Sequence, residues 1–337
     1  MAPRARPLLR ERRFERAALA QIEAHRRQQS PLGLARRLAR LPLEVHIARL
    51  DPAQIRELIE SSVVGRHARR GCGFRLGFRY GFFIDPTTPL RALAQETAAV
   101  VCCFNGERYL SELLRSIQTQ TIAPGEILVV DNASTDGSRE VARRGFPGVR
   151  LIELATNEGP CVARNRGMRE TSKRLVLALD VDVILEPDCL ERLLAAFAAD
   201  PGLAVAAPRA IAEGAAASVQ YDGARFHYTG LLSLRNFYKP LAEAEGTGVV
   251  SVDAFISVAI LADREKLLSV GGYDPAFFFY FEDSDLSYRL HSGGHRLACV
   301  EEARVTHRGG TSDLRSAAAP APRAAFITIR AIAAYSW

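Results

Sequence analysis

Apolar and polar positions follow two different rhythms from Thr97 onward. Short apolar runs at 98–104, 126–131 and 149–154 are typical of buried strands, because each is bounded by polar or turn residues. The segment 107–120 instead repeats its leucines and isoleucine at helical spacing. This alternation of strands and helices predicts an α/β fold with a mostly parallel central sheet covered by helices.

The same alternation continues toward the middle of the chain. Residues 134–144 read as a helix that Ser134 caps, and residues 187–200 read as a second helix that begins at a proline. A long apolar run, "RLVLALDVDVIL" at 174–185, and the shorter run at 202–208 are predicted strands.

Two carboxylates, Asp180 and Asp182, lie inside the apolar run at 174–185. We expect them at the exit of a strand, because ligands of open α/β sheets bind beyond the carboxyl ends of the strands. Three predicted strands end in polar residues of this kind: Phe104-Asn105, Asp131-Asn132 and Asp180-Val181-Asp182. Paired carboxylates at such a position suit Mg²⁺ or Mn²⁺ that also binds phosphate oxygens, although an Asp-x-Asp triplet also occurs in ordinary surface turns.

Charge is distributed unevenly along the 337 residues. Residues 1–95 contain 19 Lys and Arg against 8 Asp and Glu, a net +11, whereas the whole chain carries +6. The remaining body is therefore net −5, which does not favour nucleic-acid binding and is compatible with a bound divalent cation. The basic, helical pattern of the extension fits a surface that binds anionic lipid or a protein partner. It also fits a solvated extension that packs on the body, and we favour this interpretation.

The six cysteines are scattered and form no Cys-x-x-Cys pair, which is typical of reduced structural thiols. No secretory leader pattern and no apolar run of membrane-spanning length is apparent. We therefore expect a cytoplasmic protein, with the extension as a candidate peripheral contact at the inner face of the cell membrane.

Six segments occur in an order that resembles the family 2 glycosyltransferases, the inverting GT-A type, and in particular their rhamnosyltransferase-like branch. They are "VVCCFNGERYLSELLRSIQTQ", "EILVVDNASTDGSREVA", "NEGPCVARNRGM", "LALDVDVILEPDCLERLL", "SVGGYDPAFFFYFEDSDLSYRLHSGGHRL" and "VTHRGGTS". The resemblance covers about residues 97 to 312. It implies a basic extension at 1–95, a GT-A domain at 96–315 and a short helical tail at 316–337, which we expect to be a shortened end.

The resemblance implies a divalent-metal site. Asp180-Val181-Asp182 matches the family's Asp-x-Asp motif, in which the second carboxylate contacts Mn²⁺ or Mg²⁺ and the first helps to hold the metal and the ribose. His307 in "VTHRGG" matches a third metal ligand of many relatives, although a lone histidine is more often structural.

It also implies a nucleotide-sugar site. The residues that match are Phe104, Asn105, Asp131, Asn132, Asn157, Arg164, Asn165 and Asp180. Many relatives carry Asp-Asp where this chain has Asp131-Asn132, so either of the two is a candidate for reading the base. Arg164 fits a phosphate ligand or a helix-surface arginine.

The acceptor side follows from "YFEDSDLSYRL". Asp283 matches the general base, which would take the proton of an acceptor hydroxyl, and Glu282 and Asp285 stand beside it. Gly271 and Gly272 match a turn facing the acceptor. The acidic residues also fit a simple helix start that the helix dipole stabilises.

The reaction implied by the resemblance moves a sugar, with inversion, from a UDP- or dTDP-linked donor to a hydroxyl of a saccharide or lipid-linked acceptor in cell-surface glycan synthesis. A GT-A module that binds a glycan or a protein partner without turnover is the alternative. No nucleophilic serine or cysteine motif, phosphate-binding P-loop or Gly-x-Gly-x-x-Gly is present, which argues against ATP hydrolysis and NAD chemistry.

Overall fold

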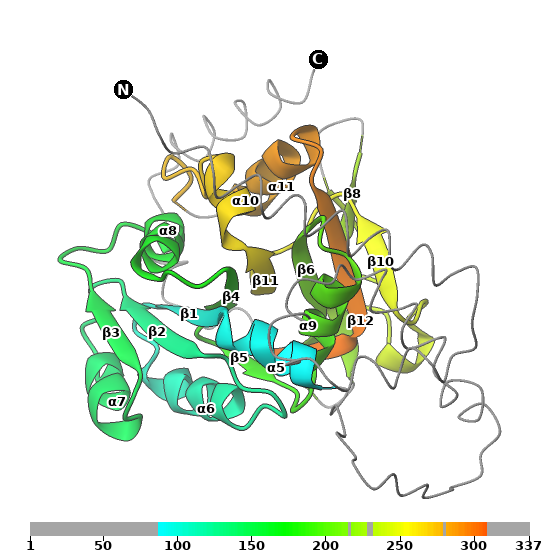
Figure 1. Ribbon diagram of the computed structural model, residues 1–337. Coiled ribbons are helices and arrows are strands. Elements are labelled where there is room, and N and C mark those ends of the chain that lie inside the picture. Colours follow the sequence, from blue (N-terminus) through cyan, green and yellow to red (C-terminus); the bar gives the residue numbers. More distant parts are fainter. Residues whose placement is uncertain (1–86, 215–216, 228–231, 279–280, 309–337) are drawn as a thin grey trace, which may run out of the picture. The chain divides into compact units, whose positions relative to one another are not determined.

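The computed structural model describes residues 87–308, except 215–216, 228–231 and 279–280 (Figure 1). The predictions for the basic extension up to residue 86, for Cys72 and for the tail at 316–337 lie outside the described residues. No helix in the described ranges is both long and apolar enough to cross a bilayer.

The described elements alternate between helix and strand along the chain. The helices are α5 (Thr88–Gln95), α6 (Glu107–Gln118), α7 (Ser138–Gly145), α8 (Pro160–Glu170), α9 (Cys189–Ala199), α10 (Arg264–Ser269) and α11 (Glu282–Ser292), with a 3-10 turn, η4 (Leu241–Glu243). The strands are β1 (Thr97–Cys103), β2 (Glu126–Asp131), β3 (Arg150–Glu153), β4 (Leu175–Asp180), β5 (Val183–Leu185), β6 (Leu203–Ala212), β7 (Ser218–Tyr221), β8 (Ala224–Phe226), β9 (Leu232–Leu234), β10 (Val249–Val252), β11 (Ala259–Asp263) and β12 (Arg296–His307).

One half of the main sheet is parallel, as the alternation predicted. The path of the sheet is β10-β12-β6-β11-β4-β1-β2-β3, and β1 pairs in parallel with both β2 and β4. Strands β1 and β4 are buried over nearly their whole length, as expected for central parallel strands covered on both faces. The carboxyl ends of β1, β2 and β4 therefore meet at one edge of the sheet.

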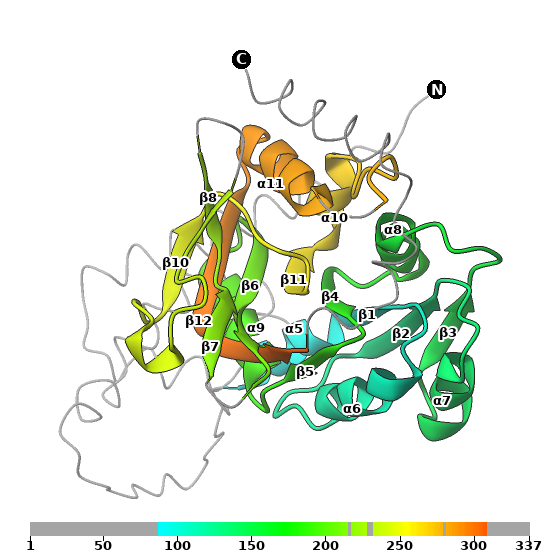
Figure 2. The ribbon, with the colours of Figure 1, turned by 180° about the vertical axis from the view of Figure 1, so that it is seen from behind.

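The other half of the sheet is mixed. Strand β11 is antiparallel to β4 and β6, whereas β6 and β12 run parallel. The last three residues of β12 also pair antiparallel with the short strand β5, with His307 opposite Val183. Figure 2 shows β12 crossing from this half of the sheet toward β5.

Helices cover both faces of the sheet, and each face has its own apolar core (Figures 1 and 2). The cluster under α6, α7 and α9 contains Leu113 and Leu193, and Ala94 of α5 belongs to it. The cluster under α8, α10 and α11 contains Met168 and Leu286. Because α5 contributes to the first core, the packed body already includes residues that the sequence pattern assigned to the extension; the domain limits stay predictions.

One local prediction is wrong in detail. Ser134 does not cap α7, which begins four residues later with Gly137 before it; the Ser134 hydroxyl instead accepts the backbone N–H of Asn105, from a loop that is distant in sequence. The apolar run at 174–185 divides at the expected strand exit: β4 ends at Asp180, the chain turns at Val181, and β5 starts on a different partner.

The cysteines within the described residues are all free thiols, as expected. Four of these five are buried, and burial raises the pKa of Cys103 and of Cys299 to about 12. Such thiols are protonated at neutral pH and serve as small apolar side chains.

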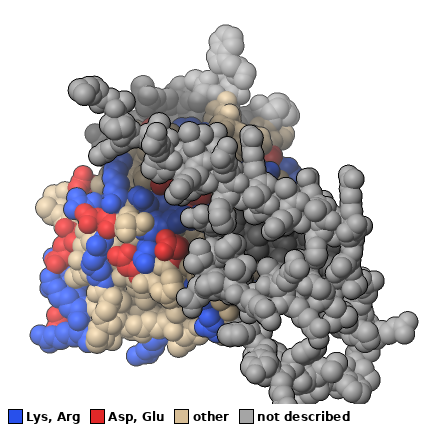
Figure 3. Space-filling model, in the orientation of Figure 1, with Lys and Arg blue, Asp and Glu red and all other residues tan. Residues whose placement is uncertain are grey.

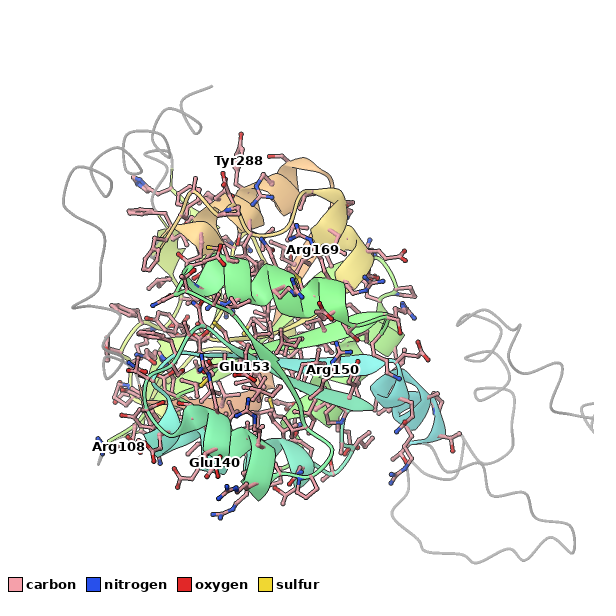
Figure 4. All side chains as sticks on the ribbon, turned by 90° about the vertical axis from the view of Figure 1, so that its left-hand side faces the viewer. Arg108, Glu140, Arg150, Glu153, Arg169 and Tyr288 are labelled. Atoms are coloured by element: carbon pink, nitrogen blue, oxygen red, sulfur yellow. The ribbon has the colours of Figure 1, made fainter. Side chains whose placement is uncertain are left out.

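Lys and Arg are interspersed with Asp and Glu on the side of the body near β3 (Figure 3). Arg150 and Glu153 stand on β3, and Glu140 lies on α7 below them (Figure 4). Glu153 forms ion pairs with Arg139 and Arg143. This face is charged but of mixed sign.

Candidate functional site

The strand register gathers the predicted donor-site residues at one edge of the sheet. Cys103 of β1 lies opposite Asp131 at the end of β2, and Cys102 lies opposite Asp180 at the end of β4. Phe104 and Asn105 follow β1 directly and are half-buried. The three strand ends that the sequence singled out are therefore neighbours.

Asp131 is completely buried at this edge. Its Oδ2 accepts hydrogen bonds from the backbone N–H of Ser134, 3.1 Å away, and from Nε of Arg139, 2.6 Å away. Its Oδ1 has no hydrogen-bond partner among the described residues. A buried carboxylate oxygen without a partner is costly, so a donor from a ligand or from water is expected there.

Asn132 and Asn157 fasten two loops to each other beside Asp131. The Asn132 side-chain amide donates to Oδ1 of Asn157 over 2.8 Å. Oδ1 of Asn132 accepts the backbone N–H of Glu158. Asn105, with φ 48°, accepts the backbone N–H of Thr135. These side chains shape the loops around the strand ends, and their direct contact with a nucleotide stays a prediction.

Arg164 is a buried cation between two carboxylates. Its Nη2 lies 2.6 Å from Oδ1 of Asp180 and its Nη1 lies 3.5 Å from Oε1 of Glu282. Its guanidinium also lies over the ring of Tyr273, 5.2 Å from the centroid. Burial opposes the charge of Arg164, but Asp180 and the neighbouring acidic groups outweigh burial and raise its pKa well above the ordinary value.

The helix-surface alternative for Arg164 is therefore wrong, because only 5% of the side chain is exposed. Its Nε and Nη1 lack hydrogen-bond partners within residues 87–308 as the structure describes them. The helix position explains the burial: a Cβ on Gly167, one turn later in α8, would lie 2.2 Å from Cγ1 of Val100, so α8 presses directly on β1.

Glu282 and Asp283 are the first two residues of α11 and follow a strained residue. The residue before them, Phe281, has φ 68°, a left-handed conformation that is unfavourable for a bulky side chain. Burial and the charge of Asp283 raise the pKa of Glu282 to about 7. Burial also raises the pKa of Asp283, against the opposing charge of Arg164 and hydrogen bonds from Ser257. Glu282 Oε2 and Asp283 Oδ1 are buried without a hydrogen-bond partner in the part of the chain that the structure describes, which a simple helix start on the surface would not produce.

Asp182 and His307 face each other across the turn after β4. The pairing of β5 with β12 brings His307 Nε2 to 3.5 Å from Asp182 Oδ1, and both side chains are about nine-tenths buried. On its other side, His307 Nδ1 lies 2.7 Å from Oε1 of Gln220. Burial opposes the charged imidazole, but the hydrogen bond and the charge of Asp182 outweigh it and raise the pKa of His307.

This pair has the chemistry of a divalent-metal site. When Nδ1–H donates to Gln220, the lone pair of His307 Nε2 points toward a carboxylate oxygen, and two acceptors at this distance need a proton or a cation between them. Within the part of the chain that the structure describes, no three His, Cys, Asp or Glu side chains converge as a preformed site, and Asp180 binds Arg164 instead. Asp182 and His307 thus fit a metal whose other positions belong to water and phosphate oxygens.

The remaining predicted residues make contacts that hold the surrounding structure. Asn165 is buried and binds both the N–H and the carbonyl of Tyr273, so it locks the turn that contains Gly271 and Gly272, whose φ values are 94° and 70°. Asp285 forms an ion pair with Arg289 one turn later in α11. These contacts are structural, and the assignment of the four residues to the acceptor side or to the nucleotide stays a prediction.

Sequence reasoning missed Gln220 and Tyr221, which reach His307 from β7. The ring of Tyr221 lies 6.3 Å from that of His307. Nothing in the sequence marks either residue, because their contact with His307 depends on β7 and β12 both pairing with the end of β6.

Known proteins similar to this chain are glycosyltransferases. Residues 98–255 match the family model "Glycosyl transferase family 2". An N-acetylglucosaminyl-diphospho-decaprenol L-rhamnosyltransferase of Mycobacterium tuberculosis is 28% identical over 233 residues, which are 62% of this chain and 75% of that protein. A glucosyl-dolichyl phosphate glucuronosyltransferase of Haloferax volcanii is 24% identical over 228 residues, 63% of this chain and 69% of that protein.

Solved glycosyltransferase structures share the fold. GalNAc-T7, solved with UDP, GalNAc and Mn²⁺, superposes with a TM-score of 0.52 at 18% identity. The match covers 63% of this chain, which spans 43% of that one. Staphylococcus aureus TarS 1–349 gives a TM-score of 0.50 at 19% identity over 71% of this chain and 64% of that one. Together with the GT-A arrangement of its sheet, the match of residues 98–255 to the family model supports a glycosyltransferase similar to those of family 2.

Proposed function

We propose that this protein transfers a sugar, with inversion, from a UDP- or dTDP-linked donor to a hydroxyl of a saccharide or lipid-linked acceptor in cell-surface glycan synthesis. The observation that carries the proposal is the facing pair of Asp182 and His307, at the same edge of the sheet as the Asp131 oxygen that lacks a partner among the described residues. A nucleoside diphosphate sugar has a base that offers hydrogen-bond donors and a diphosphate that binds a divalent cation, so it matches both groups.

Each group has a defined task in this proposal. Asp131 accepts a hydrogen bond from the base, and Asp182 and His307 hold Mn²⁺ or Mg²⁺. The cation, when bound, offsets the negative charge that develops on the leaving diphosphate. Arg164 keeps Asp180 and Glu282 in place and adds positive charge behind the diphosphate site.

Asp283 acts on the acceptor. As the acceptor oxygen forms its bond to the anomeric carbon, the bond from that carbon to the diphosphate oxygen breaks, and the hydroxyl proton passes to the Asp283 carboxylate. Its raised pKa makes it a better base than an exposed aspartate would be. A single displacement needs no covalent enzyme intermediate, which agrees with the absence of a nucleophile motif.

A glycan-binding module without turnover is the second candidate, favoured by the lack of a preformed three-ligand cluster in the described ranges. Thermal unfolding with UDP, dTDP, GDP and CDP, each with Mn²⁺ and with EDTA, separates the two. We expect one nucleotide with Mn²⁺, at a hundred times its dissociation constant, to add about 2.7 kcal/mol to the free energy of unfolding.

Asp182→Ala should abolish this gain. Glu140→Ala, which removes an exposed carboxylate of α7, should keep it (Figure 4). No metal-dependent gain with any nucleotide would exclude the transferase and leave the binding module.

A further inference from the structure

A row of aromatic rings leads from His307 to the protein surface. The ring of Tyr221 lies 6.3 Å from that of His307, and the ring of Phe237 stacks on Tyr221 with centroids 6.5 Å apart. The ring of Tyr238 meets Phe237 edge-on at 4.6 Å. We call Tyr221, Phe237 and Tyr238 the aromatic ledge.

The outer two rings of the ledge are exposed. Phe237 is 49% and Tyr238 is 57% accessible, and together with Val249 they are the large apolar side chains that the described residues leave on the surface. The aromatic ledge is also bordered by charged groups, since Lys239 forms an ion pair with Glu245. The platform is therefore small and bordered by polar side chains.

The backbone under the ledge is strained. Asn236 and Tyr238 have φ values of 46° and 54°, and this left-handed conformation is unfavourable for a bulky side chain. Without that turn the two rings would not stand side by side. Strain of this kind persists only where the surrounding structure fixes it.

A buried ion network fixes the turn to the sheet. Arg209 and Arg235 each bind Oε1 of Glu301, and Arg209 also binds Asp222, whose Oδ2 accepts the amide of Asn236 over 2.7 Å. The Asn236 amide further bonds the carbonyl and the N–H of Glu245. The loop is thus built to present its rings in a rigid position.

We infer that the aromatic ledge binds a sugar ring of the acceptor. This deepens the proposed function and rests on it. A pyranose offers a face of C–H groups that stacks on an aromatic ring while its hydroxyls bond to polar neighbours, and the aromatic ledge has both parts. A lipid chain would need a longer apolar surface than these two exposed rings provide. The row of rings ends at His307, so a sugar on the ledge extends the proposed transfer site instead of forming a separate one.

Binding of methyl glycosides tests the ledge directly. The probes are the methyl glycosides of glucose, galactose, mannose and N-acetylglucosamine, measured by saturation-transfer NMR on the full chain. We expect at least one to bind through its ring protons, and the double substitution Phe237→Ala and Tyr238→Ala to weaken it about tenfold or more, equivalent to ~1.4 kcal/mol. Phe237→Tyr should retain binding and Phe237→Leu should lose it, because only a flat ring stacks.

The controls separate this inference from the proposed function. Val249→Ala, an exposed apolar residue of β10, should leave glycoside binding unchanged. The Mn²⁺-dependent stabilisation by a nucleotide should survive in every ledge variant, which also shows that they fold. Nucleotide binding with no glycoside signal, or with a signal that the double variant keeps, overturns the ledge and leaves the proposed function intact.

Two other occupants would also overturn the inference. One is co-sedimentation with phosphatidylglycerol vesicles that is lost in the double variant, which would make the ledge a lipid contact. The other is a dimer in sedimentation velocity that the double variant dissociates, which would make it a subunit interface.

Discussion

Gln220 lies 2.7 Å from His307 and determines which ring nitrogen of that histidine faces Asp182. An amide oxygen next to Nδ1 holds the tautomer that leaves Nε2 open. Partners of this kind orient metal-binding histidines and typically change metal affinity 10–100-fold when removed. The contact links β7 to β12 through side chains alone.

Replacing this partner should weaken the metal site. Gln220→Leu should lower Mn²⁺ affinity about tenfold or more, because His307 can then turn or hold its proton on either nitrogen. Gln220→Glu keeps an acceptor oxygen and should bind Mn²⁺ nearly as well as the original protein. Titration calorimetry of Mn²⁺ in the presence of nucleotide measures both, and equal affinities for all three proteins would contradict the role of Gln220.

Removal of Arg164 should destabilise the fold. Arg164→Leu leaves Glu282 buried without a cation, and breaking such a pair typically costs about 3–5 kcal/mol. Adding Glu282→Gln in the same chain should restore part of that loss, because it removes one of the two carboxylates that Arg164 pairs with, while Asp180 stays without its cation. Urea unfolding of the two single variants and the double variant at pH 8 measures the coupling free energy between the two residues. Strictly additive effects of the two substitutions would show that Arg164 and Glu282 do not interact.

The free energy of unfolding should depend on the protonation of Glu282. Its folded pKa of about 7 lies above the ordinary value of 4.5, so the folded state favours the protonated carboxyl. The stability that this group contributes is present below pH 4.5 and is lost as the pH rises through 7. Relative to the original protein, Glu282→Gln should therefore gain stability between pH 5 and pH 8, by up to roughly 3 kcal/mol.

Urea unfolding across this pH range, with EDTA and without nucleotide, checks the direction. Asp285→Asn serves as the matched control, because Asp285 stands in the same turn of α11 but is partly exposed and paired with Arg289. A variant-to-original difference that stays constant with pH would show that Glu282 titrates normally.

The close approach of α8 to β1 gives a packing prediction. In Gly167→Ala the new methyl would lie 2.2 Å from Val100, so the helix must shift, at about 1–3 kcal/mol. Gly145→Ala, at the end of α7, has open space around its Cβ and should instead stabilise by about 0.5–1 kcal/mol. Chemical denaturation compares the two substitutions, and similar effects from both would rule out the tight contact.

Much of the parallel half of the fold could be predicted, because its strands are local apolar runs with polar exits. The position of Asp131 and Asp180 at neighbouring strand ends follows from that pattern and from parallel pairing. The ion pair between Asp285 and Arg289 could also be expected from the sequence, because the two residues are four positions apart on one helix.

The second half of the fold was less predictable, for a physical reason. The pairing of β5 with β12, which brings Asp182 to His307, is set by long-range register and leaves no local periodicity in the sequence. Ser134 was predicted to cap a helix but accepts the N–H of Asn105 instead, and this contact likewise depends on two loops that meet in the folded chain. Burial of Arg164 required knowing that Gly167 allows α8 to touch β1.

The position of β12 in the chain also has a consequence for synthesis. Asp182 leaves the ribosome well before His307, and at about 5–20 residues per second the delay is on the order of ten seconds. During that interval the parallel strands β1 to β4 are complete, yet the imidazole that faces Asp182 has not been made. A nascent chain therefore carries the parallel strands and Asp182 before His307 can face that carboxylate, so the synthesis of β12 sets the time at which this pair can form.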